Sequence, residues 1–284
     1  MPIDRQTAMA AARQAYAKMA RAGAHLCQIV SDDELRDPLA VVDGPGWLGG
    51  NIHGWRVLCL AGGGGRQSCL YAAAGADVTV VDLSADMLDL DRQAARARGY
   101  SIRLIEGSMD DLSMLAPESF DLVVHPVSTC YLPQITTVFT ATARVLRSGG
   151  IYISQHKAPV SLQASPTPSS GQHGGAFEIR HGYYDSRPVP EPEPGAVAAR
   201  LREPGAMEFV HRLEEIFGGL CRNGFIIDDV IEPDHREPNA SIGSFAHRAS
   251  FVAPYLRIKA IRRPKGSGIA NASKTPTSLW IPDP

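Results

Sequence analysis

The chain has 284 residues, a net charge of −2 and 44% hydrophobic residues, which is the composition of a folded globular protein. The near-neutral charge argues against a nucleic-acid partner, and no apolar run reaches the ~20 residues that a membrane span needs. Five widely spaced cysteines without a C-x-x-C pair indicate reduced thiols, so we expect a cytoplasmic protein without disulfides.

The first 54 residues predict a helical cap. An alanine-rich pattern indicates a helix over residues 3–21. Ser31 begins a second, shorter helix, because Glu34 stands three residues later and completes a capping box. A Gly- and Pro-rich stretch then leads into a core that we expect over residues 55–263.

The most informative feature is an apolar run over residues 56–60 that stops in four glycines, Gly62 to Gly65. A second apolar run follows and ends in Asp82. Glycines let the backbone approach a ligand closely, and an acid at the end of the next strand suits a pair of ribose hydroxyls. This arrangement predicts an adenosine-containing cofactor.

A nicotinamide dinucleotide is one alternative, and its motif G-x-G-x-x-G needs a third glycine. Counting from Gly63 gives Gly65 and then Ser68, whereas counting from Gly62 gives Gly64 and then Gln67. The third glycine is missing in both registers, which disfavours the dinucleotide.

The remaining elements complete an α/β pattern. We expect further strands starting near Tyr100, over 120–126, from Ile151, and near 225–231 and 251–261. Helical spacing over 136–147 ends at Ser148-Gly-Gly150. The prediction is a Rossmann-like, mostly parallel seven-stranded sheet with helices on both faces, an N-terminal helical cap and an insertion after strand five.

The insertion covers residues 158–205 and is rich in Pro, Ser and Gly, with an aromatic island at 177–184. Long loops inside compact domains are usually functional or disordered, so we expect a hairpin or lid. A helix over 206–222 should follow, and the tail 264–284, which contains Trp280, is expected to be flexible.

The order of these motifs resembles the class I S-adenosylmethionine-dependent methyltransferases of small-molecule type, over roughly residues 55 to 262. The run Ala143-Arg-Val-Leu-Arg-Ser-Gly-Gly-Ile-Tyr-Ile153 is similar to the segment before that family's fifth strand. A turn with Gly-Gly-Gly-x-Gln and a final Pro-Tyr-x-Arg-Ile-Lys strand resemble a little-characterised bacterial subgroup. Cys59 and Ser108 depart from the family, in which many members carry an acid at these positions.

The resemblance implies S-adenosyl-L-methionine as the cofactor. It places the glycine motif at Ala61, Gly63 and Gly65, the ribose acid at Asp82, and an adenine loop at Ser108, Met109 and Asp110. The full set of implied cofactor contacts is Ala61, Gly62, Gly63, Gly65, Gln67, Asp82, Leu83, Ser108, Met109, Asp110 and His125.

Ligands bind beyond the carboxyl ends of parallel strands, which places the chemistry after strands four and five. We expect His211 or His156 to act as the base, Glu214 to orient His211, and Tyr131 to line the site. Each histidine also has a structural interpretation. Zinc is a minor alternative, because the histidines lack local ligand spacing, and we expect no metal.

We therefore predict an enzyme that transfers a methyl group to O or N of a small molecule by in-line displacement. The alternatives are an NAD(P)-dependent oxidoreductase, an RNA-modifying protein and a non-catalytic S-adenosylmethionine-binding protein. Nothing in the sequence predicts the oligomeric state.

Overall fold

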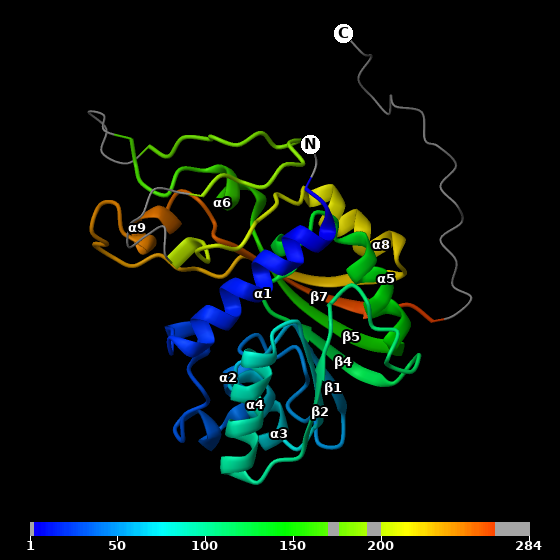
Figure 1. Cartoon of the computed structure of the whole chain (residues 1–284). Coiled ribbons are helices and arrows are strands. Elements are labelled where there is room, and N and C mark those ends of the chain that lie inside the picture. The colour runs from blue at the N-terminus through cyan, green and yellow to red at the C-terminus, as the bar shows by residue number, and fades with distance from the viewer. Residues whose placement is uncertain (1–2, 170–175, 192–199, 265–284) are drawn as a thin grey trace.

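The computed structural model describes residues 3–169, 176–191 and 200–264. Its centre is a seven-stranded sheet with the order β3-β2-β1-β4-β5-β7-β6 (Figure 1). The strands are β1 Arg56–Leu60, β2 Asp77–Asp82, β3 Ile102–Glu106, β4 Phe120–His125, β5 Leu146–Lys157, β6 Phe225–Ile231 and β7 Tyr255–Arg262. β7 is antiparallel to both neighbours and the other four pairings are parallel. This confirms the predicted fold class.

Helices cover both faces of the sheet, as predicted. Side chains alternate along β1, so Val57 and Cys59 face one apolar layer while Leu58 and Leu60 face the other. The first layer includes buried residues of α3 Gln67–Ala73 and α4 Ala85–Arg98. The second packs against α5 Thr136–Val145, the π-helix η4 Glu214–Gly218 and α8 Gly219–Arg222.

The N-terminal cap begins with α1 Arg5–Arg21, whose first turn is capped by the Asp4 carboxylate. The short helices η1 His25–Cys27, η2 Glu34–Arg36 and α2 Pro38–Val42 follow. The predicted capping box is present, because the Ser31 amide donates to Glu34 at 2.9 Å, but the turn that it starts is a 3-10 helix. In Figure 1, α1 crosses in front of the sheet.

The predicted stop of the helix before strand five is wrong. α5 ends at Val145, and β5 begins at once with Leu146. Leu146 pairs with Phe120 and Ile151 pairs with Leu122, so the residues between them form a bulge inside the strand. Gly149 allows this bulge, because its φ of 72° lies in the left-handed region.

The predicted helix over 206–222 is wrong in its first half, because the regular helical segment starts only near Glu214. Before that point the backbone bonds to other segments. The Phe209 amide donates to the Cys130 carbonyl at 2.8 Å, and the Glu208 carbonyl accepts from the Val189 amide at 2.7 Å. These tertiary bonds and the burial of Phe209 replace the helical hydrogen bonds.

In its described parts, the insertion contains α6 Pro159–Gln163 and one isolated bridge between Ala164 and Ile179. Phe177 packs against Phe251, which follows α9 Phe245–Ala249. Residues 170–175 and 192–199 and the tail 265–284, with Trp280, lie outside the described residues. Within the described part, no helix is long and apolar enough to cross a membrane.

Candidate active site

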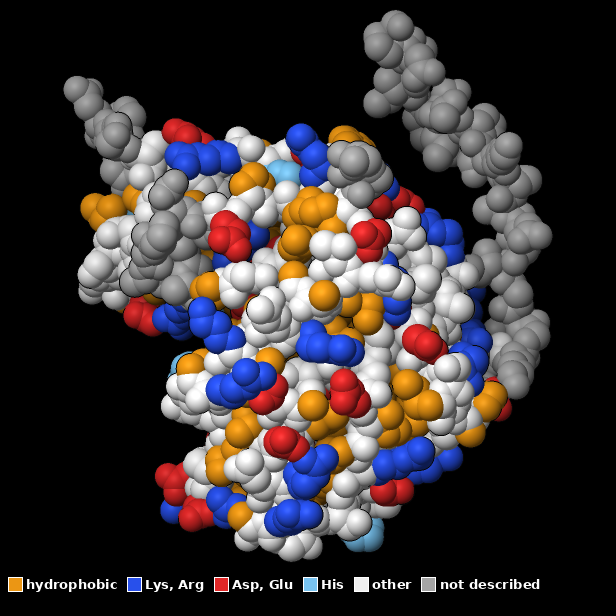
Figure 2. Space-filling model, viewed as in Figure 1, with side chains coloured by type: hydrophobic (Ala, Val, Ile, Leu, Met, Phe, Trp, Pro, Cys, Tyr) orange, Lys and Arg blue, Asp and Glu red, His pale blue; other side chains and the backbone are white. Residues whose placement is uncertain are grey.

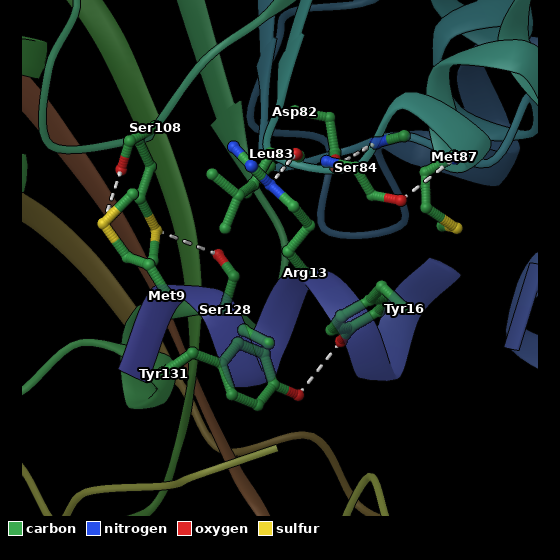
Figure 3. A pocket seen from close by; sticks show the side chains of 14 residues that line it. Met9, Arg13, Tyr16, Asp82, Leu83, Ser84, Met87, Ser108, Ser128 and Tyr131 are labelled. Atoms are coloured by element: carbon green, nitrogen blue, oxygen red, sulfur yellow. Dashed lines mark hydrogen bonds between the residues drawn. The ribbon is translucent and has the colours of Figure 1, made fainter. Parts of the chain in front are cut away.

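A pocket of about 620 Å³, including its mouth, lies at the carboxyl ends of the first strands (Figure 3). Its floor comes from the segments after β1, β2, β3 and β4, and its roof from α1. The floor residues are Ala61, Gly63, Asp82, Leu83, Ser84, Met87, Ser108, Met109, Ser128 and Tyr131. The roof residues are Met9, Ala12, Arg13 and Tyr16. The size and position suit a small-molecule cofactor site.

The glycine turn lies tightly against the next strand. A Cβ at Gly63 would come within 2.9 Å of the Asp82 carboxylate and 2.8 Å of the Met87 Cβ, so this position requires glycine. Ala61 has a φ of 49° at the pocket wall, an unusual value for a residue with a side chain.

Asp82 lines the pocket at the end of β2. Each of its carboxylate oxygens accepts one backbone amide, from Gly63 and from Ser84, at 2.9 Å. Burial raises the pKa of Asp82, and these hydrogen bonds oppose the shift. Each carboxylate oxygen retains a further lone pair, which is what a ribose diol requires.

Asp91 on α4 binds the other side of the glycine turn. Its carboxylate accepts the amides of Gly64 and Gly65 at 2.9 and 3.1 Å and also accepts the Ser68 hydroxyl. Burial raises the pKa of Asp91 to about 6. These amides would bind the pyrophosphate of a dinucleotide, and an internal carboxylate occupies them. The turn therefore disfavours the oxidoreductase alternative.

Arginines hold α1 over the pocket. Arg5 bonds to Asp110 at 2.6 Å, Arg13 donates to the Leu83 carbonyl at 3.1 Å, and Arg21 bonds to Asp86 at 3.0 Å. Asp110 consequently faces Arg5 and does not line the pocket, unlike its predicted neighbours Ser108 and Met109.

Three other predicted cofactor contacts also lie away from the pocket wall. Gly65 packs against α4, where a Cβ would come within 2.8 Å of the Leu90 carbonyl oxygen. Gly62 faces the Gln67 side chain. Gln67 itself lines a second cavity on the other side of the turn.

His125, another predicted cofactor contact, does not line the pocket but borders the second cavity. Its ring nitrogens hydrogen-bond to Tyr152 and Ser128, both at 2.6 Å, and burial lowers its pKa to about 3. The neutral ring thus supports Ser128, which does line the pocket.

The two histidines expected to act as the base are both buried outside the pocket lining. His156 bonds to Thr129 and Ser154, at 2.8 and 2.9 Å, and burial lowers its pKa to about 3. His211 Nε2 lies 3.0 Å from the Thr129 carbonyl, and burial lowers its pKa as well. A neutral ring makes that bond only by donating, so Nε2 carries the proton.

The expectation that Glu214 orients His211 is wrong. Glu214 is 56% exposed and pairs with Arg212 and Arg222 at 3.2 and 2.7 Å. Glu214 starts the π-helix, whereas His211 lies in the irregular segment before it, so the two side chains do not share one helical face as predicted.

Tyr131 is the predicted catalytic residue that lies in the pocket wall. Its hydroxyl donates to the Glu203 carboxylate at 2.6 Å and lies 3.0 Å from the Tyr16 hydroxyl (Figure 3). Lys157 bonds to Glu203 and Glu208, at 2.7 and 2.9 Å. Arg202 pairs with Glu208 at 2.8 Å, so two cations balance two carboxylates in the interior.

Sequence reasoning missed the α1 residues in the roof, and also Ser84 and Met87. The cap was expected, but no local pattern tells which face of an alanine-rich helix meets the cofactor. Among the described residues, no cluster of three His, Cys, Asp or Glu side chains is arranged to hold a metal ion.

Comparison with known proteins identifies the family. A model described as "Methyltransferase domain" matches residues 58–154. The uncharacterized methyltransferase YbaJ of Bacillus subtilis is 38% identical over 183 residues, which cover 64% of this chain and 69% of that protein. The chain belongs to the S-adenosylmethionine-dependent methyltransferases. The methyltransferase fold and its cofactor, S-adenosyl-L-methionine, therefore agree with the pocket described above.

Other similar proteins share shorter segments or the fold alone. This methyltransferase is 33% identical over 99 residues to a ubiquinone biosynthesis O-methyltransferase of Xanthomonas euvesicatoria, covering 35% of this chain and 41% of that protein. An S-adenosylmethionine-dependent methyltransferase of Mesorhizobium loti superposes with a TM-score of 0.57 at 21% sequence identity. The superposition covers 75% of this chain and 93% of the Mesorhizobium loti chain. Geranyl diphosphate C-methyltransferase of Streptomyces coelicolor superposes with a TM-score of 0.54 at 16% sequence identity, and the superposition covers 79% of each chain.

Proposed function

We propose that this methyltransferase transfers its methyl group to an oxygen or nitrogen atom of a small molecule bound beneath α1. The observation that carries the proposal is the hydroxyl-lined wall made by Tyr16, Tyr131 and Ser128. These groups suit a polar acceptor that must be oriented and must lose a proton.

The comparisons support only part of this proposal. One relative is named an O-methyltransferase, whereas a protein of the same fold is named a C-methyltransferase. The acceptor atom therefore varies within the fold, and the choice of O or N rests on the polar wall. The near-neutral charge favours a small molecule over a nucleic acid.

The residues at the pocket fit the cofactor. Asp82 would hold the ribose hydroxyls, with the Ala61 and Gly63 backbone beside it, and Ser108 and Met109 would border the base. When bound, the sulfonium supplies an already activated methyl group, so the main task of the protein is to place the acceptor in line.

The hydrogen bonds that link Tyr16, Tyr131 and Glu203 define a path for the proton that the methyl acceptor loses. The single proton of Tyr131 is directed to Glu203, so the Tyr16 hydroxyl must donate to the Tyr131 oxygen. The Tyr16 lone pairs are then left to accept a proton from a substrate in the pocket. A proton taken up there moves through Tyr131 to Glu203.

Glu203 is a suitable final acceptor because it is ionised. Burial alone would raise its pKa, but the charge of Lys157 and hydrogen bonds from Lys157 and Tyr131 bring the pKa below its ordinary value. Lys157 keeps Glu208 as a partner when Glu203 takes up a proton. We therefore favour Tyr16 and Tyr131 over His211 and His156, which do not line the pocket.

The described insertion contributes Glu203 to this path. We retain the proposal that the insertion, through residues 177–184, acts as a lid that excludes water during transfer. Tyr183 supports a connection between this segment and the core, because its hydroxyl accepts the Leu213 amide at 3.1 Å.

The test is a screen for labelled methyl transfer from S-adenosylmethionine into metabolite pools, followed by turnover measurements on variants. Tyr16→Phe should lower kcat about 100- to 10,000-fold and leave S-adenosylhomocysteine affinity unchanged. Tyr100→Phe is the matched control, because Tyr100 lies just before β3, at the end of that strand opposite the pocket. Wild-type turnover in Tyr16→Phe, with a loss in His211→Ala or His156→Ala, would return the role of base to a histidine.

A further inference from the structure

A second cavity lies on the other side of the glycine turn from the cofactor pocket. It has a volume of about 760 Å³, including its mouth. Its lining reaches across β4 and β5 to β7, whereas no residue of β5 or β7, both fully described, lines the cofactor pocket. β7 is three strands away from β1, so this end of the cavity lies roughly 14 Å from the strand that leads into the glycine turn. The cavity can therefore hold a ligand that is separate from the cofactor.

Two side chains from neighbouring strands make the polar end of the cavity. Gln155 of β5 and Arg257 of β7 stand directly opposite each other in the antiparallel ladder, and both line the cavity. Nε and Nη2 of Arg257 donate to the side-chain oxygen of Gln155 at 3.1 and 2.8 Å. This arrangement leaves Nη1 of Arg257 and the amide NH₂ of Gln155 available as donors.

Arg257 supplies a positive charge that no acid neutralises. Among the described residues, no carboxylate lies within salt-bridge distance of it, whereas Arg66 in the same lining pairs with Glu34. Asp43 is the one acid in the described lining, and its two oxygens accept the backbone amides of Trp47 and of the following residue, at 2.7 and 2.8 Å. The polar end of the cavity therefore favours an anionic ligand.

Apolar side chains make the remaining walls of the cavity. They include Val42, Trp47, Tyr71, Val124 and Ile153. Trp47 belongs to the N-terminal cap and is fixed from both sides, because its amide donates to Asp43 and its indole Nε1 donates to Asp229 of β6 at 2.8 Å. Aromatic and aliphatic walls with a few fixed polar groups are typical of a small-molecule site.

We propose that the second cavity binds a small organic acid other than the cofactor. Its carboxylate binds Arg257 and the Gln155 amide, and its apolar body packs against the aromatic and aliphatic walls. A guanidinium presents its N–H groups in a plane that matches a carboxylate, so an acid fits this end better than a neutral molecule of the same shape. An acidic methyl acceptor and an acid that is not itself methylated share this chemistry. The site is independent of the proton path in the first pocket.

The first test is calorimetric titration of the enzyme, saturated with S-adenosylhomocysteine, with benzoate and with its neutral isostere benzamide. Wild type should bind benzoate about 10- to 100-fold more tightly than benzamide. Arg257→Gln should bind the two probes equally, and Arg257→Lys, which keeps the charge without the planar fork, should recover part of the difference. Lys259→Gln is the matched control, because it removes a cation of the same strand outside the cavity, and it should behave like wild type.

Three outcomes of this titration would overturn the assignment. They are no binding of benzoate to wild type at millimolar concentration, equal affinity of wild type for the two probes, and an unchanged preference for benzoate in Arg257→Gln. Benzoate binding to the free enzyme that disappears on saturation with S-adenosylhomocysteine would also overturn it, because the charge would then serve the cofactor. Circular dichroism of each variant separates these results from unfolding.

A second test identifies the natural acid. Wild type and Arg257→Gln are incubated with a metabolite extract, and acids that only wild type retains are identified by mass spectrometry. Labelled methyl transfer to such an acid marks it as the methyl acceptor, whereas retention without transfer marks a separate ligand. The absence of any acid retained selectively by wild type would contradict the site. Failure of Tyr16→Phe to lower turnover, with benzoate binding intact, would contradict the proposed proton path and leave this site standing.

Discussion

The hydroxyl oxygens of Tyr16 and Tyr131 lie 3.0 Å apart, although 115 residues separate them in the chain. Their rings meet edge to face, with centroids 5.6 Å apart. Because Tyr131 also bonds to Glu203, one side chain joins the cap helix, the core and the insertion at the pocket wall. A ligand in the pocket therefore has a direct route by which it can affect all three.

This connection leads to a prediction on the insertion. Residues 177–184 should exchange their amide hydrogens more slowly when cofactor and acceptor are both bound, because a closed lid excludes water. The measurement is hydrogen exchange by mass spectrometry, with α8 as a region remote from the pocket for comparison. Equal exchange of 177–184 with and without ligands would make the insertion a static part of the surface.

Asp82 should determine cofactor affinity. Asp82→Ala is expected to lose about 1–3 kcal/mol of S-adenosylhomocysteine binding, since the ribose hydroxyls then lack a partner in a buried site. Asp77→Ala at the exposed start of the same strand is the control and should bind normally. Calorimetry gives both values, and unchanged affinity in Asp82→Ala would contradict the assignment.

Asp91 should matter for stability rather than for direct ligand contact. Asp91→Ala leaves the Gly64 and Gly65 amides without their acceptor in the interior, which should cost about 2–4 kcal/mol in urea unfolding. Asp89→Ala is the matched control on the same helix, because that carboxylate is 56% exposed, and it should change stability by less than about 0.5 kcal/mol. Similar losses in both variants would contradict the role of Asp91.

The buried histidines should make the fold sensitive to acid. The pKa values of His125 and His156 fall to about 3 in the folded state, from 6.5 in an unfolded chain. The unfolded chain then binds more protons between these values, so stability falls as the pH drops below about 6.5. At pH 5, each histidine should lower the free energy of unfolding by about 2 kcal/mol relative to its value well above pH 6.5.

Urea unfolding of wild type and His156→Gln between pH 8 and pH 5 measures this effect. The raised pKa values of Asp82 and Asp91 act in the opposite direction in both proteins. The informative quantity is therefore the difference between wild type and His156→Gln in the slope of the free energy of unfolding against pH. The variant should lose less stability on acidification, even if it is less stable at pH 8. Parallel slopes would mean that His156 is not buried in its neutral form.

The sequence predicted the fold well where local patterns carry the information. Apolar runs that end in Gly62 or Asp82 mark buried parallel strands, and the pocket follows from their carboxyl ends. The helix stop at Ser148 failed because glycine serves equally in a helix cap and in a β-bulge. Only pairing with β4 distinguishes the two.

The candidate base was harder to predict because it depends on tertiary contacts. His211 was assigned from a helix that does not form at that position, since Phe209 bonds to the Cys130 carbonyl instead. Glu203 was not recognised because its partners Tyr131 and Lys157 lie on distant elements. A single sequence gives residue types at a sheet edge, but not which of them reach the cavity.

The position of α1 also has a consequence for how the chain assembles during synthesis. Arg5, Arg13, Arg21 and Tyr16 bind partners that are translated later, between Leu83 and Tyr131. α1 can therefore complete these contacts only after the first four strands have emerged. The roof of the pocket thus comes before its floor in the chain and must wait for that floor to be made.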